Sequence, residues 1–242
     1  MIRKFIRIIL LSIIPFYLFI SFSLFAHKGE HEICKEVRIV IQDSLEMPFL
    51  KLRDVEAVLK RNNISPIGKE MWRIDTYDLS MRLEENQIIR KAVCYKTPDG
   101  TLRIGIYQRN PILRVMGVSG NYYIDDEGIT MPVSYNFTAH LPVATGYVTR
   151  EMATTELHRF ALFLEENKFW RAQIEQIHVL ANGEVQLIPK VGEQVILLGN
   201  FTNFEKKLDN LLTFYQKGLR KKGWNAYKTI NLKYENQVIC SK

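Results

Sequence analysis

The five histidines are the first residues to weigh as catalytic or metal-binding groups; they are His27, His31, His140, His158 and His178. His27 and His31 stand four residues apart, a spacing that places two imidazoles on one face of a helix. A zinc site requires three or four protein ligands, and only Glu30 and Glu32 lie nearby in sequence. We therefore interpret this stretch as solvated, and we expect His178, within a predicted strand, to be packed or hydrogen-bonded.

A second candidate is the acidic run Asp125-Asp126-Glu127-Gly128. A calcium loop needs oxygen ligands at alternating positions and a closing bidentate acid, and this run has neither. We predict a tight turn instead, in which the carboxylates accept hydrogen bonds from local backbone N–H groups and Gly128 has a positive φ.

No other motif indicates chemistry. Cys34, Cys94 and Cys240 match no zinc or redox spacing, so we expect unpaired thiols, although one disulfide stays open. The chain lacks a nucleophile elbow, a zinc-protease helix and a glycine-rich phosphate loop. These absences predict a binding protein rather than an enzyme, with no catalytic or metal site, no cofactor and no small-molecule substrate.

The net charge of +7 raises the question of nucleic acid. The basic residues are spread along the chain among 26 acidic ones, without a basic stripe or an aromatic-rich binding motif. The cluster Arg220-Lys221-Lys222 falls at the expected end of a helix, where cations stabilise the helix dipole. We therefore predict no nucleic-acid partner.

The N-terminal segment from Ile8 to Ala26 contains nineteen residues without a charge. At ~1.5 Å per residue a helix of this length spans the ~30 Å apolar core of a bilayer, and Pro15 is tolerated in membrane helices. A cleaved signal peptide is the alternative, but its apolar stretch is shorter and ends in a small-x-small site. We predict a single transmembrane helix over residues 8–26.

Orientation follows from the flanking charges. Arg3, Lys4 and Arg7 precede the apolar segment, whereas the charges after it are mixed in sign. The positive-inside rule places residues 1–7 in the cytoplasm as a short tail and everything after Ala26 on the far side of the membrane; the family resemblance described below implies that this is the inner membrane and that the far side is the periplasm.

The exported part reads as two modules of the α+β class. Residues 34–111 predict the order β-α-α-β-β, with strands over residues 34–42, 88–96 and 102–108 and helices starting near Lys51 and at Asp75 or Thr76. Pro98-Asp99-Gly100 marks the turn between the last two strands. Residues 112–242 predict a mostly antiparallel β domain with two helices, over residues 154–167 and 203–220.

The last predicted strand covers residues 229–240. Ile230, Leu232 and Tyr234 alternate with Asn231 and the outward-facing Lys233 and Glu235. Because no strand follows it, we expect this strand to form a sheet edge, whose unpaired N–H and C=O groups accept another chain.

Several tracts resemble the bacterial FtsQ/DivIB family of division proteins. Ile104 to Pro111 is similar to that family's strand ending in Glu-Arg-x-Pro, with Gln108 in place of the glutamate, and Tyr122 to Gly128 is similar to its turn. Leu141-Pro142-Val143, Gly146 and the tract from Ile230 to Tyr234 follow in the family's order. On this resemblance the family motif residues are Arg109, Pro111, Asp125 and Gly128, and the first module is POTRA-type.

The resemblance implies a Bacteroidetes-like member that works as a non-enzymatic scaffold of the divisome at the septum. Such a scaffold links early and late division proteins and binds the bitopic partners FtsB and FtsL, whose segment adds as a β-strand. The residues implied in partner binding are Thr229, Ile230, Asn231, Leu232, Lys233, Tyr234 and Glu235.

Two alternatives stay open. A POTRA-type envelope protein for outer-membrane assembly or secretion would carry several such modules or a following β-barrel. An anchored cell-wall enzyme would bring dispersed acidic residues together in a cleft.

Overall fold

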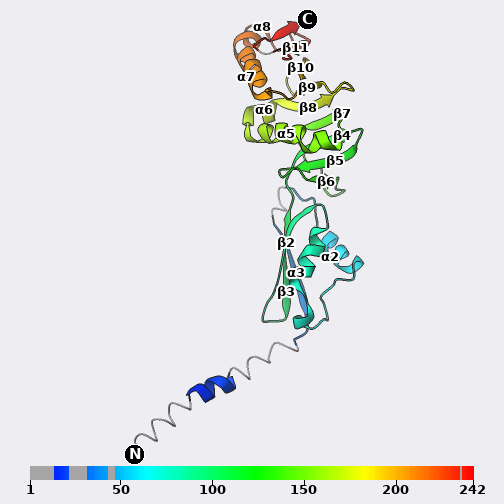
Figure 1. Cartoon of the computed structure of the whole chain (residues 1–242), viewed down its shortest axis with the longest axis vertical. Coiled ribbons are helices and arrows are strands. Elements are labelled where there is room, and N and C mark those ends of the chain that lie inside the picture. Colours follow the sequence, from blue (N-terminus) through cyan, green and yellow to red (C-terminus); the bar gives the residue numbers. More distant parts are fainter. Residues whose placement is uncertain (1–13, 22–31, 43–46, 235) are drawn as a thin grey trace, which may run out of the picture. The chain divides into compact units, whose positions relative to one another are not determined.

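The computed structural model describes residues 14–21, 32–42, 47–234 and 236–242. The chain divides into two compact units, Met1–Gln108 and Arg109–Lys242. The division falls three residues before the boundary expected at residue 111. Figure 1 shows both units coloured along the sequence.

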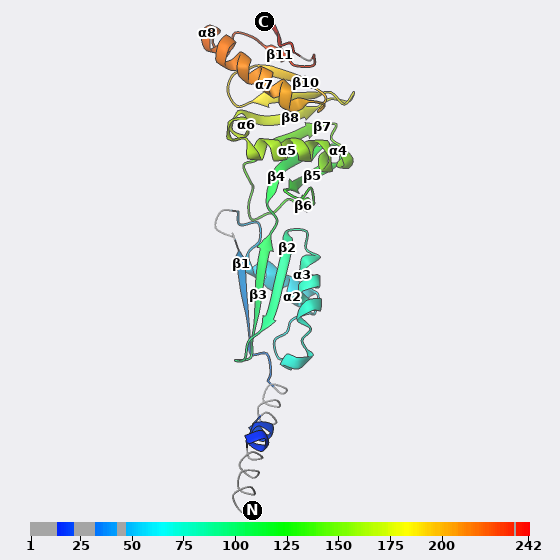
Figure 2. The ribbon, with the colours of Figure 1, turned by 60° about the vertical axis from the view of Figure 1, so that its left-hand side comes forward.

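The first unit is a three-stranded sheet with helices on one face. Its elements are β1 (Glu36–Gln42), α2 (Leu52–Arg61), the 3₁₀ helix η1 (Met71–Arg73), α3 (Thr76–Glu84), β2 (Ile89–Lys96) and β3 (Thr101–Gln108). The strand order is β1-β3-β2, with β1 parallel and β2 antiparallel to β3. This is the predicted β-α-α-β-β order, and α2 and α3 lie on the same side of the sheet (Figures 1 and 2).

Local signals explain why these elements form. The Asp75 carboxylate accepts hydrogen bonds from the N–H groups of Tyr77 and Asp78, so it caps the start of α3 as predicted. Along the central strand, Leu102, Ile104 and Ile106 are buried and alternate with side chains on the opposite face. The period of two therefore fixes which face of the sheet the helices cover.

The second unit contains a nine-stranded sheet in the order β12-β11-β10-β9-β8-β7-β4-β5-β6. The strands are β4 (Pro111–Gly117), β5 (Gly120–Asp125), β6 (Thr130–Pro132), β7 (Val143–Gly146), β8 (Ile174–Val179), β9 (Val185–Pro189), β10 (Val195–Gly199), β11 (Thr229–Asn231) and β12 (Ile239–Ser241). The Asn182-Gly183 turn joins β8 to β9, as predicted.

This sheet is mixed rather than simply antiparallel. Five of the pairings among the described strands are antiparallel, and three are parallel. Two of the parallel pairings, β7 with β8 and β10 with β11, join strands that are connected through helices. Such a crossover returns the chain in the same direction, which makes the two strands parallel.

The described helices of this unit outnumber the two that were predicted. They are α4 (Arg150–Thr154), α5 (Glu156–Glu166), α6 (Lys168–Gln173), α7 (Phe204–Phe214), the π-helix η2 (Tyr215–Leu219) and α8 (Arg220–Lys222). The helix predicted over residues 154–167 is present as α5, and α4 and α6 are added before and after it because polar side chains start new helices. Thr149 caps α4, and the Asn167 side chain accepts the N–H groups of Phe169 and Trp170 at the start of α6.

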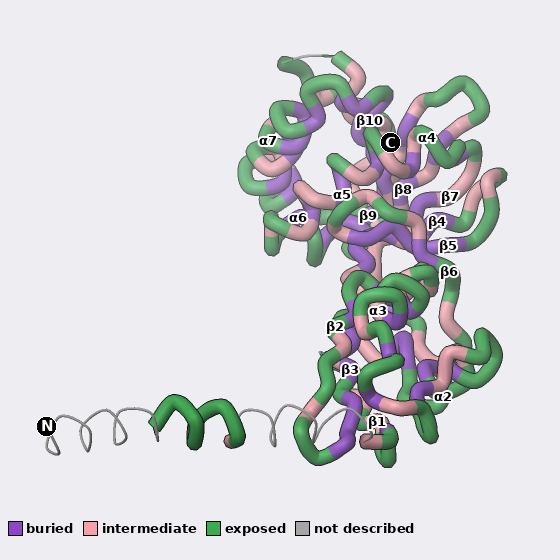
Figure 3. Tube along the Cα trace, turned by 60° about the horizontal axis from the view of Figure 1, so that its bottom comes forward, coloured by how far each residue is buried: buried purple, intermediate pink, exposed green. Residues whose placement is uncertain are grey.

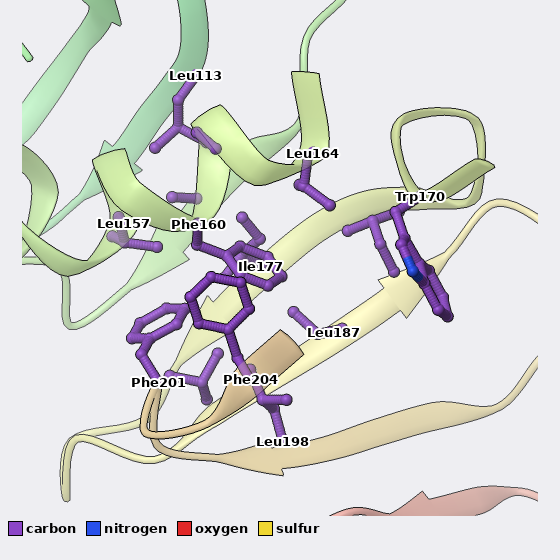
Figure 4. Packing of buried hydrophobic residues seen from close by; sticks show 14 of the residues in the cluster. Leu113, Leu157, Phe160, Leu164, Trp170, Ile177, Leu187, Leu198, Phe201 and Phe204 are labelled. Atoms are coloured by element: carbon purple, nitrogen blue, oxygen red, sulfur yellow. The ribbon is translucent and has the colours of Figure 1, made fainter. Parts of the chain in front are cut away.

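The core of the second unit lies between the sheet and α5, α6 and α7. Leu157, Phe160 and Leu164 project from α5 into this layer (Figure 4). The ring of Phe160 meets Phe204 edge to face with centroids 5.0 Å apart, and Phe201 lies at 5.4 Å. These contacts hold the helices over the strands and so support the C-terminal strands that follow α7.

The described part of the N-terminal segment, residues 14–21, is helical, and its large apolar side chains are 41–72% exposed (Figure 3). Pro15 lies in this helix, whereas Ile8 and Ala26 fall outside the described residues. Among the described helices, none has both the length and the apolar character that a bilayer crossing requires. The membrane anchor therefore stays a prediction.

Tyr215, at the start of η2, makes the stability of the second unit sensitive to alkaline pH. Burial raises the pKa of its hydroxyl to about 12, and the nearby amides of Gln194 and Gln173 oppose that shift. Because the folded pKa exceeds the unfolded value of ~10, the contribution is complete below pH ~10 and is lost as pH rises towards 12.

Between pH 8 and 12 the wild-type protein is expected to lose more unfolding free energy than Tyr215→Phe. The difference between the two losses is expected to be on the order of 2–3 kcal/mol. Urea unfolding of both proteins between pH 8 and 12 measures the difference, since other tyrosines and lysines titrate equally in both. Parallel pH profiles for the two proteins would contradict this assignment.

Candidate partner-binding site

The C-terminal segment differs from the single strand predicted over residues 229–240. It forms β11 over Thr229–Asn231, leaves the sheet, and returns as β12 over Ile239–Ser241, antiparallel to β11. The expectation that the strand starting at Thr229 forms the sheet edge is therefore wrong. β10 lies on one side of β11 and β12 on the other.

Two asparagines account for the break in the strand. The Asn231 side chain accepts a hydrogen bond from the N–H of Lys233 at 2.9 Å, which bends the chain away from the sheet. Asn236 adopts a left-handed conformation with φ 63°, which a β-strand does not contain. Asparagine favours turns, so these two residues indicate the break in the strand. The alternation of apolar side chains taken by itself predicts an unbroken strand.

The three side chains predicted to face the core differ in burial before and after the chain leaves the sheet. Ile230 and Leu232 are buried in the core, as predicted, and the N–H of Leu232 donates to the carbonyl of Leu197 in β10. Tyr234 was also expected to face the core, but it is 60% exposed because the chain has already left the sheet. Glu235 lies outside the described residues.

Lys233 fastens this exposed segment to the β8–β9 hairpin. Its Nζ donates to Oε1 of Glu184 at 2.6 Å, and both side chains are about one-third exposed. The Lys233 ammonium lowers the pKa of the Glu184 carboxyl. The ion pair spans the end of β10 and fixes the segment that leads from β11 to β12.

One open edge of the sheet belongs to β12, which has β11 as its one neighbour among the described strands, and the strand at the other edge is β6. The carbonyl of Ser241 accepts the N–H of Lys228, so the backbone groups of Ser241 point towards β11. Backbone groups of successive strand residues point in opposite directions. The N–H and C=O of Cys240 therefore point away from β11, towards the open edge. The strand predicted over residues 229–240 ended at Cys240, but this residue was not among those implied in partner binding.

The four predicted motif residues come together at the start of the second unit. Arg109 precedes β4, and Pro111 in β4 pairs with Asp125 at the end of β5. Asp125 is completely buried, and its Oδ2 accepts Nη1 of Arg109 at 2.9 Å. Its Oδ1 accepts the N–H groups of Glu127 and Ile129 at 3.0 and 2.6 Å.

This turn is structural, as the acidic run suggested. Gly128 has φ +80°, and the ring of His158 packs where a side chain at Gly128 would lie. Both oxygens of Asp125 are occupied by hydrogen bonds, which leaves it unsuited to act as a general base. The turn holds β4 and β5 together rather than presenting a reactive carboxylate.

The described residues contain little else that indicates chemistry. Nδ1 of His178 is hydrogen-bonded to Oγ1 of Thr145 at 2.9 Å, as expected for a packed strand residue. All three cysteines are free, and burial raises the pKa of each thiol. Across the described ranges, no group of three or more His, Cys, Asp or Glu side chains could hold a metal ion.

Comparison with known proteins covers both units. Residues 32–107 match a POTRA-like domain, and residues 110–241 match the family model described as FtsQ/DivIB, C-terminal related. A curated relative is the cell division protein FtsQ of Rhodothermus marinus, 26% identical over 187 residues that cover 71% of this chain and 67% of the relative.

The family model for residues 110–241 covers more than half of the chain, and it coincides with the sheet that carries the Arg109–Asp125 turn and the β12 edge. The POTRA-like match coincides with the first unit and its β-α-α-β-β order. The chain therefore belongs to the FtsQ/DivIB family, a family of non-enzymatic division proteins, and this membership implies a role in cell division.

Proposed function

We propose that this chain is a non-enzymatic scaffold of the divisome that captures FtsB- and FtsL-like bitopic partners by β-strand addition at β12. In this role it links early and late division proteins at the septum. It is held in the inner membrane by the segment over residues 8–26, with its two units in the periplasm.

The observation that carries the proposal is the open edge of β12. A sheet edge offers a row of unpaired backbone groups that another extended segment completes. The side chain of Ile239 in β12 is exposed, and we expect it to supply an apolar contact for the added strand. Thr229 to Asn231 were expected to bind the partner directly. They form β11, the strand that pairs with β12.

Depletion of the protein in its native cell tests the division role. We expect long, undivided filaments that continue to grow, because a scaffold that links division proteins is needed for septation but not for elongation. Microscopy with septa and membranes stained measures cell length and septum frequency.

Normal septation after verified depletion would contradict the scaffold. Outer-membrane assembly defects with normal septation would instead favour the other class of POTRA proteins. Altered wall cross-linking with normal septation would point to an enzyme.

A further inference from the structure

Gly105, in the middle of the central strand β3, has no explanation within its own unit. Glycine in a strand interior costs roughly 0.5–1 kcal/mol relative to alanine, since it loses more backbone entropy on folding. Gly105 is not among the described residues with positive φ, and the β-bulge between β2 and β3 lies at Ile89 and Lys91 instead. A Cβ at Gly105 would meet nothing closer than the carbonyl of Val93, at 3.8 Å.

Conformation, bulging and internal crowding are thus excluded as reasons for this glycine. Strand glycines are also found where a ligand or another backbone approaches closely, and an approach from outside the chain fits Gly105. The side of β3 on which Gly105 lies is available for such a group. The buried side chains of Leu102, Ile104 and Ile106 pack in one cluster with residues of α2 and α3, and Gly105, which alternates with them along β3, lies on the opposite face.

Gly105 carries no side chain, whereas its register neighbours on this face are apolar, and we call the space between them the depression. In the strand register, Val40 of β1 and Val93 of β2 lie on either side of Gly105. Along β3, Arg103 and Tyr107 stand before and after it, roughly 14 Å apart at strand spacing. Val40, Val93 and Tyr107 are exposed although they are apolar.

Cations outnumber acids at the register positions around the depression, with Glu36 and the nearby Asp99 as the acids on this side. Arg38, Arg103 and Lys91 are exposed at the neighbouring register positions. The acidic residue nearest in register, Glu36, is already engaged with Arg38, whose guanidinium donates to it at 2.9 and 3.2 Å. A ligand for this face therefore combines an apolar side chain with negative charge beside it.

We propose that the open face of the first unit binds an acidic peptide segment of another protein, which inserts one large apolar side chain over Gly105. The apolar side chain packs between Val40 and Val93, and its acidic neighbours pair with Arg103 and Lys91. This inference goes beyond the proposed function and does not rest on it, because it concerns residues in the other unit.

Gly105→Val is the decisive variant, because it fills the depression without disturbing the fold. The glycine has ordinary backbone conformation and free space above it, and valine favours strands. The full chain in nanodiscs of zwitterionic lipid is titrated with three blocked pentapeptides in which Leu, Phe or Trp stands between pairs of glutamates. We expect binding that Gly105→Val weakens at least about tenfold, the effect of excluding one buried apolar side chain.

Charge is tested by a matched pair of variants. Arg103→Gln removes a cation beside the depression and is expected to weaken binding and reduce its salt dependence. Lys60→Gln removes an exposed cation from α2, on the covered side of the sheet, and is expected to leave binding unchanged. Thermal unfolding of every variant verifies that the unit remains folded.

Three results would overturn the proposal. One is no binding of any of the acidic peptides, and another is equal binding to the wild-type protein and a folded Gly105→Val variant. The third is hydrogen-exchange protection of β1–β3 that appears only when phosphatidylglycerol is added to the nanodisc, since an anionic bilayer would then occupy this face.

Discussion

Cys240→Pro is expected to lower the affinity of the protein for its FtsB-like partner at least about tenfold, because it removes the outward N–H at the centre of β12. The carbonyl of Ser241 accepts the N–H of Lys228, which orients Ser241 towards β11 and Cys240 towards the open edge. A strand that adds there needs the Cys240 N–H as a donor, and the proline ring also blocks its approach.

The same variant is expected to leave the second unit folded. Proline is tolerated in edge strands when its missing N–H faces solvent, because no hydrogen bond within the sheet is lost. β12 lies at the edge of the nine-stranded sheet, so this condition is met at Cys240 and not at its neighbours. The matched control is Cys240→Ala, which removes the thiol but keeps the N–H and is expected to bind normally.

Binding is measured with the full chain in nanodiscs and the labelled periplasmic segment of the FtsB-like partner, by fluorescence anisotropy. Equal affinity of the proline and alanine variants, with both folded, would exclude strand addition at β12. The division role would stand in that case if depletion still gave filaments, and the partner would bind elsewhere on the chain.

Asp125→Ala is expected to cost the second unit about 3 kcal/mol or more of unfolding free energy, since it leaves the Arg109 guanidinium without its buried partner. The Arg109 side chain is 16% exposed and keeps a 3.2 Å contact with Glu127, which limits the loss. The N–H groups of Glu127 and Ile129 also lose their acceptor, at about 1–3 kcal/mol for each donor left unsatisfied.

Urea unfolding followed by the fluorescence of the buried Trp170 measures this effect in the second unit. Asp209→Ala, which removes an exposed carboxylate from α7, is the control and is expected to change stability by less than about 0.5 kcal/mol. The double variant Arg109→Met/Asp125→Leu is expected to be more stable than Asp125→Ala, because it removes both charges together. A loss as small as that of the control would mean that the turn does not depend on this ion pair.

Local sequence signals were sufficient to predict the first unit. The Asp75 cap, the Pro98-Asp99-Gly100 turn and the alternation along β3 act between residues close in the chain, so they are legible without a structure. The same is true of the Asn182-Gly183 hairpin and of the acidic turn with Gly128 at positive φ.

Tertiary structure decided which strands are neighbours. A period of two identifies a strand and its buried face, but it does not name the strand that pairs with it. The parallel pairings of β7 with β8 and of β10 with β11 depend on the helices that cross between them. The Arg109–Asp125 ion pair likewise joins residues sixteen positions apart, which only the pairing of β4 with β5 brings together.

At the candidate site, too, the sequence pattern identified a strand but not its neighbours in the sheet. The sequence by itself determined that an apolar strand begins near Thr229 and that Ile230 and Leu232 enter the core. Only the structure showed that the chain turns away at Asn231, exposes Tyr234 and returns as β12, with Cys240 at the open edge. The physical reason is that an edge is defined by the absence of a hydrogen-bonded neighbour, and that property belongs to the whole sheet.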